Sequence, residues 1–113
     1  MISVKKLIGK TICISTEDGA KLNQEIRNEL EKEQDKVVIS FEGIDLLISH
    51  FLNESIGKLY LDKNKWEMLD EQISYVGMNK DDEILLKTKV IPTYKEKDKK
   101  EVLKIQNRIL RKR

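Results

Sequence analysis

The sequence predicts an α/β protein in which a mixed β-sheet is flanked by helices. Short segments rich in β-branched and apolar residues alternate along the chain with segments whose apolar residues recur every three or four positions. The chain has 113 residues, the length of one small domain. Its composition, 39% apolar and 37% charged with 5% aromatic residues, indicates a single soluble domain with an aliphatic core.

The first two β-like segments lie on either side of Gly9. Residues 2–8, ISVKKLI, and residues 10–15, KTICIS, are both short and β-branched, so we expect two strands joined by a tight turn. Cys13 lies inside the second segment, with no basic side chain or helix beside it that would lower its thiol pKa. We therefore interpret Cys13 as a small buried hydrophobe.

The next segment, residues 15–34, has the period of a helix. Leu22, Ile26 and Leu30 recur every four residues and predict one apolar face. Ser15 offers a side-chain oxygen to the unpaired amides of the first turn, and Asp18 suits the positive end of the helix dipole. A helix is therefore expected to begin close to Ser15.

A nearly continuous apolar run, KVVISFEGI, occupies residues 36–44. Such a run is typical of a strand covered on both faces, so we place it at the centre of the sheet. Residues 50–61 then have the apolar spacing of a second helix. Gly57 costs this helix about 1 kcal/mol relative to Ala, which indicates a close approach by a neighbouring element.

The elements of the last third are less uniform. Residues 62–72 are polar and ambiguous, residues 73–78 (ISYVGM) indicate another strand, and residues 79–91 indicate a helix opened by Asn79. Pro92 is expected to end or kink that helix near Val90 or Ile91, because proline has no amide donor and disfavours helical geometry in the preceding residue. The predicted order is ββαβαβα followed by a C-terminal helix.

The C-terminal segment differs from the rest of the chain in charge. Residues 1–94 contain 13 Lys and Arg against 17 Asp and Glu, whereas residues 95–113 contain 9 against 3. We expect a domain over residues 1–92 and a basic amphipathic helix over residues 93–113, packed on the domain, on a partner or on a second copy of the chain. The apolar stripe of this helix is formed by Val102, Ile105 and Ile109.

No motif for catalysis or cofactor binding is evident in the sequence. It contains no Gly-rich phosphate loop and no nucleophile elbow, and its acidic and basic residues fall mostly on predicted exposed helix faces. With one Cys and one His it can form neither an internal disulfide nor a zinc site. We therefore expect a protein that is not an enzyme and holds no metal or cofactor, with the cytoplasm as its compartment.

Membrane spanning and secretion are not indicated, because no run of about 18 apolar residues and no signal-like apolar region occur.

Glu42 and Asp45 follow the central strand, where α/β sheets often place ligand sites. Two carboxylates could hold a cation, but two oxygen donors are few for such a site, and a polar turn around Gly43 is the alternative.

Ser49 and His50 stand at the predicted start of the second helix. One interpretation is structural, because a Ser oxygen there can cap the unpaired amides of the first turn. The other is regulatory, because a phosphate at a helix N-terminus is electrostatically favoured and strongly changes the surface. Both interpretations stay open on the local pattern.

The order of elements and residues 37–60, VVISFEGIDLLISHFLNESIGKLY, together resemble the STAS-like domain, a relative of the sulphate-transporter and anti-sigma-factor-antagonist (STAS) domains. The helix start EDGAKL at residues 17–22 adds to the resemblance, which covers roughly residues 1–92. It implies a mixed sheet with helices on its faces that works as a non-catalytic interaction module.

The resemblance also implies a switch site. In the antagonist proteins, a Ser at the start of the helix after the central strand is phosphorylated by a partner kinase of the GHKL ATPase type, and phosphorylation releases the partner. Gly43 and Ile44 match the end of the antagonist strand, and the two serines that follow in the antagonists fall on Ser49 and His50. His50 thus stands where the phosphorylated Ser would be, and Ile48 replaces an acidic residue, so Ser49 and His50 together are the candidate switch site.

Two functions follow as hypotheses. The first is a bacterial-type cytoplasmic regulatory module that binds a GHKL-type ATPase or an anti-sigma factor. The residues expected to bind this partner are Asp45, Ser49, His50, Asn53 and Glu54. The alternative is nucleic-acid binding by the basic C-terminal segment, although no aromatic residue interleaves its charges for base stacking. Its candidate phosphate contacts are Lys104, Arg108, Arg111, Lys112 and Arg113.

Overall fold

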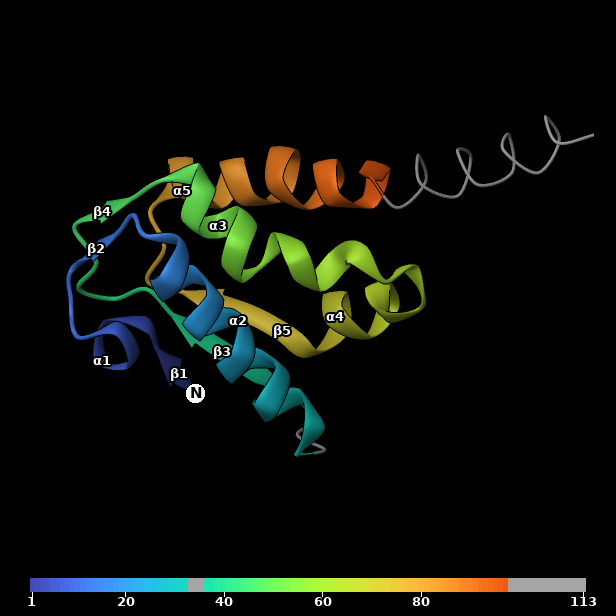
Figure 1. Cartoon of the computed structure of the whole chain (residues 1–113), viewed down its shortest axis with the longest axis horizontal. Coiled ribbons are helices and arrows are strands. Elements are labelled where there is room, and N and C mark those ends of the chain that lie inside the picture. Colours follow the sequence, from blue (N-terminus) through green and yellow to red (C-terminus); the bar gives the residue numbers. More distant parts are fainter. Residues whose placement is uncertain (33–35, 98–113) are drawn as a thin grey trace, which may run out of the picture.

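A computed structural model of the chain describes residues 1–32 and 36–97. It contains two small β-sheets and a set of helices packed around them (Figure 1). The predicted α/β class is confirmed. The larger sheet has the order β1-β3-β5 and the smaller one pairs β2 with β4. The strands are β1 (Ile2–Ser3), β2 (Ile12–Cys13), β3 (Val37–Ser40), β4 (Leu46–Leu47) and β5 (Ile73–Val76).

All strand pairs among the described residues are parallel, where we had expected a mixed sheet. The difference begins at the N-terminus, where only Ile2 and Ser3 form a strand and α1 (Val4–Ile8) follows at once. Ser3 caps this helix, and Gly9 ends it in the left-handed conformation at φ +68°. The predicted hairpin is therefore wrong, and without it β1 and β2 pair in different sheets.

The helix predicted after Ser15 is confirmed as α2 (Thr16–Glu31). The Ser15 hydroxyl accepts a hydrogen bond of 3.0 Å from the Asp18 amide. Gly19 lies where α2 meets α3 (Ser49–Ser55), and a Cβ atom added to it would stand 2.8 Å from the Glu54 Cβ atom. The absence of a side chain at Gly19 thus allows the two helices to pack closely.

The second predicted helix, residues 50–61, is divided in the structure. α3 gives way after Ile56 to a 3-10 helix over Gly57–Leu61, and a second short 3-10 helix precedes α4 (Trp66–Gln72). Gly57 is buried under the ring of Tyr94, which confirms the close approach expected at this glycine. The ambiguous residues 62–72 therefore contain a helix of their own.

The last helix begins as predicted, because the Asn79 side chain accepts hydrogen bonds from the amides of Asp81 and Asp82 at the start of α5 (Lys80–Leu85). It does not end at Pro92. A π-helical turn over Leu86–Val90 precedes the proline, and helical structure continues to Lys97.

A π-helical turn has hydrogen bonds between residues five apart in place of the four of an α-helix. This change of pattern comes just before Pro92, which has no amide proton to donate. We call the whole element, residues 80–97, the final helix. The domain boundary expected after residue 92 falls inside it, and Tyr94 beyond that point is 7% exposed and belongs to the core.

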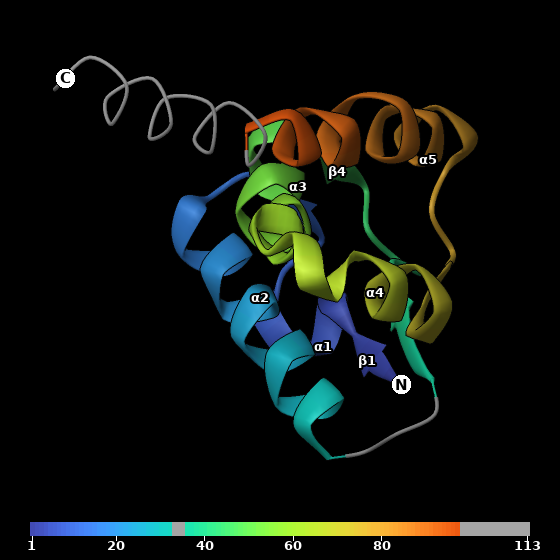
Figure 2. The same ribbon diagram turned by 90° about the vertical axis from the view of Figure 1, so that its right-hand side faces the viewer.

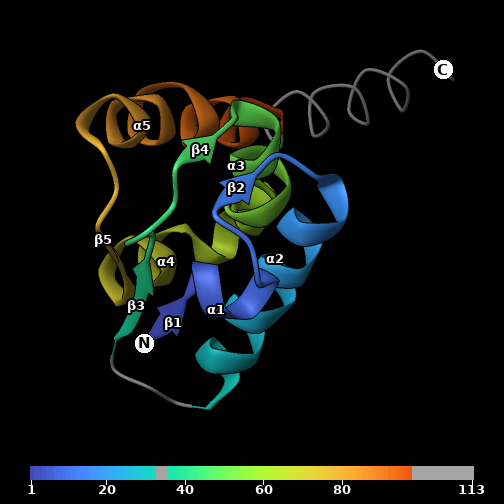
Figure 3. The ribbon, with the colours of Figure 1, turned by 90° about the vertical axis from the view of Figure 1, so that its left-hand side faces the viewer.

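The larger sheet is covered on one face. Residues that pair in register point to the same side, and the set containing Ile2, Ile39 and Tyr75 faces the helices. In Figures 2 and 3, which view the molecule from opposite sides, α2 and α3 lie together to one side of the strands. On the other face Val38 is half-buried and Val76 is exposed. β3 is central, as predicted, but the described elements do not cover both of its faces.

Within the described part of the chain, no helix combines the length and the apolar character needed to cross a lipid bilayer.

Candidate functional site

The two short strands β2 and β4 form a separate parallel ribbon. Ile12 pairs with Leu46 and Cys13 with Leu47. The ladder extends at both ends, because the Asp45 amide donates to the Thr11 carbonyl at 2.7 Å and the Ile48 amide donates to the Cys13 carbonyl at 3.2 Å. Neither strand pairs with another strand among the described residues, so each has one edge without a strand partner.

One face of this ribbon is apolar and exposed. Cys13 and Leu47 point inward, Cys13 being fully buried and Leu47 partly so. The alternate side chains point outward, and each is exposed: Ile12 by 39%, Ile14 by 43%, Leu46 by 51% and Ile48 by 38%. We call this surface the apolar ribbon, and it consists of Ile12, Ile14, Leu46 and Ile48.

The apolar ribbon was missed by the sequence analysis, although its signal is present. Each of the two segments is apolar at three consecutive positions, Ile12 to Ile14 and Leu46 to Ile48. Because strand side chains alternate between faces, three such residues in a row make both faces apolar. The sequence does not say that the two segments lie together, since 32 intervening residues separate Cys13 from Leu46.

Ser49 and His50 follow the apolar ribbon directly and begin α3, and both are exposed. Ile48 holds the N-cap position, with no side-chain capping hydrogen bond, so Ser49 does not have the capping role considered above. The His50 ring nitrogen Nε2 lies 3.3 Å from the Thr16 hydroxyl. His50 thus connects the first turns of α2 and α3.

Three of the five predicted partner-binding residues flank β4 and are exposed. Asp45 is exposed at the start of β4, and Ser49 and His50 are exposed at its end. Asn53 and Glu54 lie further along α3 and are half-buried. Glu54 packs on Gly19 of α2 and forms an ion pair of 2.7 Å with Lys58, so its carboxylate is already engaged.

The carboxylates of Glu42 and Asp45 lie in a turn where Gly43 adopts a φ of +81°. Among the described residues, no group of three or more His, Cys, Asp and Glu side chains is placed to hold a metal ion.

Burial raises the pKa of the Cys13 thiol to about 11. This thiol is therefore protonated at neutral pH and confirmed as a buried hydrophobe.

Comparison with known families gives a match over residues 18–83 to the STAS-like domain of unknown function (DUF4325). That span exceeds half of the chain. The chain belongs to this family. The resemblance recognised in the sequence is thereby confirmed, and the match includes α2, β3, β4 and α3.

The STAS-like match starts after Ile12 and Ile14, so one strand of the apolar ribbon lies outside it. Comparison with curated proteins finds no match, and neither does comparison with solved structures. The basic helix predicted over residues 93–113 is described only as far as Lys97, within the final helix, and its candidate nucleic-acid contacts lie outside the described residues. They are Lys104, Arg108, Arg111, Lys112 and Arg113.

Proposed function

We propose that this STAS-like domain is a non-catalytic regulatory module that binds a protein partner through the apolar ribbon and the polar residues at its ends. The observation that carries the proposal is a group of four exposed aliphatic side chains, two of them paired in register on β2 and β4 and two directly following these strands. Single exposed aliphatics are common on protein surfaces, whereas an aligned group of this kind is typical of an interaction site. Asp45, Ser49 and His50 adjoin this group and provide polar contacts at its border.

The edges of β2 and β4 that have no strand partner among the described residues offer a second means of binding. An open edge presents unpaired amide and carbonyl groups to which an extended partner segment can add as a further strand. Main-chain hydrogen bonds then supply affinity, and side chains of the partner segment contact the aliphatic face. Both strands are only two residues long, so the added pairing would be short and the aliphatic contacts would contribute much of the binding.

The class of partner comes from the STAS resemblance. A GHKL-type ATPase or kinase, or an anti-sigma factor, is the partner we propose, in the bacterial cytoplasm. Ser49 is the proposed switch, because its side chain is exposed at the end of β4. A phosphate there would place a charge of about −2 beside Ile48 and oppose contact with an apolar partner surface.

The proposal is tested by direct binding to GHKL-type ATPases and anti-sigma factors encoded beside this gene. Ile14→Asp and Leu46→Asp should each weaken the binding at least about tenfold, because each places a charge in the apolar contact. Leu61→Asp is the matched control, since Leu61 is 45% exposed, close to the 43% of Ile14, and lies in the 3-10 helix after α3.

Calorimetry measures the affinities, and circular dichroism establishes that each variant is folded. Equal affinity for the Ile14 and Leu61 variants would show that the partner does not use the apolar ribbon. Failure of every such ATPase and anti-sigma factor to bind the unmodified chain would reject this class of partner.

A further inference from the structure

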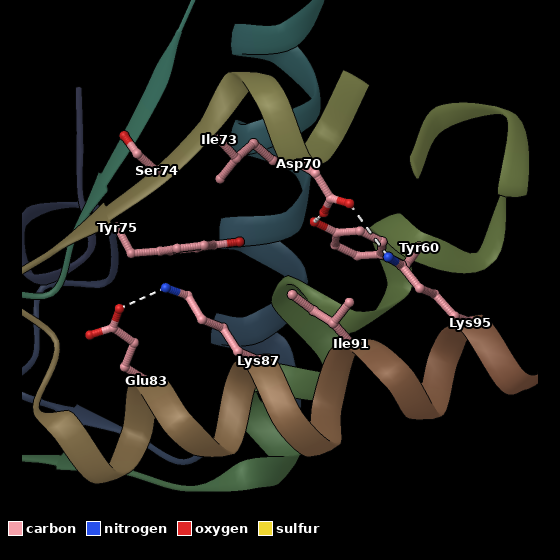
Figure 4. A pocket seen from close by; sticks show the side chains of 9 residues that line it. All are labelled: Tyr60, Asp70, Ile73, Ser74, Tyr75, Glu83, Lys87, Ile91 and Lys95. Atoms are coloured by element: carbon pink, nitrogen blue, oxygen red, sulfur yellow. Dashed lines mark hydrogen bonds and ion pairs between the residues drawn. The ribbon is translucent and has the colours of Figure 1, made fainter. Parts of the chain in front are cut away.

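A cavity of about 460 Å³ lies between β5 and the final helix (Figure 4). One wall comes from Ile73, Ser74 and Tyr75 of β5, and the opposite wall from Lys87 and Ile91 of the final helix. Small-molecule sites in proteins commonly occupy between about 300 and 1,000 Å³, so this cavity has room for a small organic ligand. None of its lining residues belongs to the apolar ribbon.

Tyr75 points its hydroxyl group toward this cavity (Figure 4). The hydroxyl oxygen is fully buried and is the only such side-chain nitrogen or oxygen among the described residues that has no hydrogen-bond partner. The neighbouring Tyr60 differs, because its hydroxyl donates to Asp70 at 2.8 Å. Buried hydroxyl groups in proteins nearly always have a partner, so the position of Tyr75 calls for an acceptor or donor from outside the chain.

The hydroxyl of Tyr75 is a hydrogen-bond donor at physiological pH. Burial raises the pKa of Tyr75 well above its ordinary value, and the negative charge of Asp70 adds to this effect. A neutral phenol has one proton to donate. The partner that Tyr75 lacks is therefore best supplied as an acceptor oxygen.

The two ammonium groups at the cavity also keep donors available for a ligand. The Lys87 ammonium contacts the Glu83 carboxylate at 2.8 Å, and the Lys95 ammonium contacts Asp70 at the longer distance of 3.4 Å. Each ammonium carries three protons, so each can still donate to a ligand. Asp70 already accepts from both Tyr60 and Lys95 and is the less available of the two carboxylates for a ligand cation.

We infer that this cavity binds a small organic carboxylate with an apolar or aromatic body. The body of the ligand would lie against Ile73 and Ile91, and its carboxylate would accept from the Tyr75 hydroxyl and from Lys87. A ligand cation would have to compete with Lys87 for Glu83 or with Lys95 for Asp70, and a wholly apolar ligand would leave the Tyr75 hydroxyl unpaired.

Benzoate is a suitable probe, added to the full chain while backbone amide NMR signals are recorded. We expect saturable shifts in β5 and the final helix. Tyr75→Phe should weaken benzoate binding about tenfold, because a hydrogen bond to a charged acceptor is lost. Lys87→Gln should weaken it by a similar factor, whereas Lys89→Gln, an exposed position two residues along the same helix, should leave it unchanged.

Benzyl alcohol, the neutral counterpart of benzoate, separates recognition of the carboxylate from burial of the ring. Tighter binding of benzoate than of benzyl alcohol, by about tenfold, supports the inference. Benzoate binding that is equal in the unmodified chain and in Tyr75→Phe would overturn it, as would equal affinity for the two probes. Absence of saturable shifts up to about 10 mM benzoate would likewise overturn it and leave an internal water as the partner of Tyr75.

Discussion

Replacing Gly57 by Ala should destabilise the protein, although Ala favours helical structure more than Gly does. A Cβ atom at this position would lie 2.6 Å from Cε2 and 2.7 Å from Cδ2 of the Tyr94 ring. The shorter distance is about 0.8 Å below the 3.4 Å at which ordinary contact begins. The ring is buried, so the final helix has to move away from the 3-10 helix to admit a methyl group.

The expected magnitude follows from two opposing contributions. Overpacking of a well-filled site costs about 1–3 kcal/mol, and the better backbone preference of Ala returns up to about 1 kcal/mol. The free energy of unfolding should therefore fall by about 1–2 kcal/mol, which corresponds to a decrease in Tm of roughly 4–8 °C for a chain of this size. Urea unfolding measured by circular dichroism gives the free energy, and calorimetry gives Tm.

A double-mutant cycle with Tyr94→Val identifies the cause, because Val lacks the ring atoms that Cβ would meet. In that background Gly57→Ala should be neutral or stabilising by up to about 1 kcal/mol. Two results would refute the reasoning: a Gly57→Ala variant as stable as the unmodified chain, or an equal loss of stability in both backgrounds. The second result would place the cost in the backbone of residue 57 and not in its contact with Tyr94.

Three further predictions concern a helix cap, a thiol and the basic C-terminus. Asn79→Ala should lower the free energy of unfolding by about 1 kcal/mol in urea titrations, because two amides of the first turn of α5 lose their acceptor. The raised thiol pKa of Cys13 means that, as pH rises, the unfolded chain loses this proton before the folded chain does. The free energy of unfolding should therefore fall as pH rises from about 9 to about 11. The Cys13→Ala variant should lack that part of the decrease. If the alternative function holds, the full chain should bind duplex DNA with an affinity that falls steeply between 50 and 200 mM salt, and Arg108→Gln should reduce that salt dependence; an affinity that does not vary with salt would count against it.

The sequence predicts best those elements whose signals are local. α2 is found from its four-residue apolar spacing and the Ser15 cap, and α5 from Asn79 and the acidic residues that follow it. β3 is found from its nearly continuous apolar run. In these elements the periodicity and the terminal residues indicate the same structure, so tertiary contacts only reinforce it.

The elements that the sequence misassigns are short or depend on distant contacts. Val4 and Ile8 are four residues apart, which suits one turn of helix, yet a seven-residue segment with three β-branched residues also suits a strand. The π-helical turn that carries the final helix past Pro92 is likewise not visible in a local pattern.

The candidate site shows the same division. Ser49 and His50 were identified from their place after the central strand and from the family resemblance. The apolar ribbon depends on the pairing of β2 with β4 across a long stretch of chain, and no local property of either segment reports that pairing. The Tyr75 cavity depends on how the final helix lies over β5, which the sequence leaves undetermined.

The hydrogen bond between His50 and Thr16 has a mechanical consequence for the apolar ribbon. Each of its strands runs straight into a helix, β2 into α2 and β4 into α3, and these helices are joined at their first turns by this bond and packed together at Gly19. A partner that binds the two strands therefore also holds the two helices in one fixed arrangement. A displacement of the bound strands is passed to α2 and α3 together, without first separating these two helices.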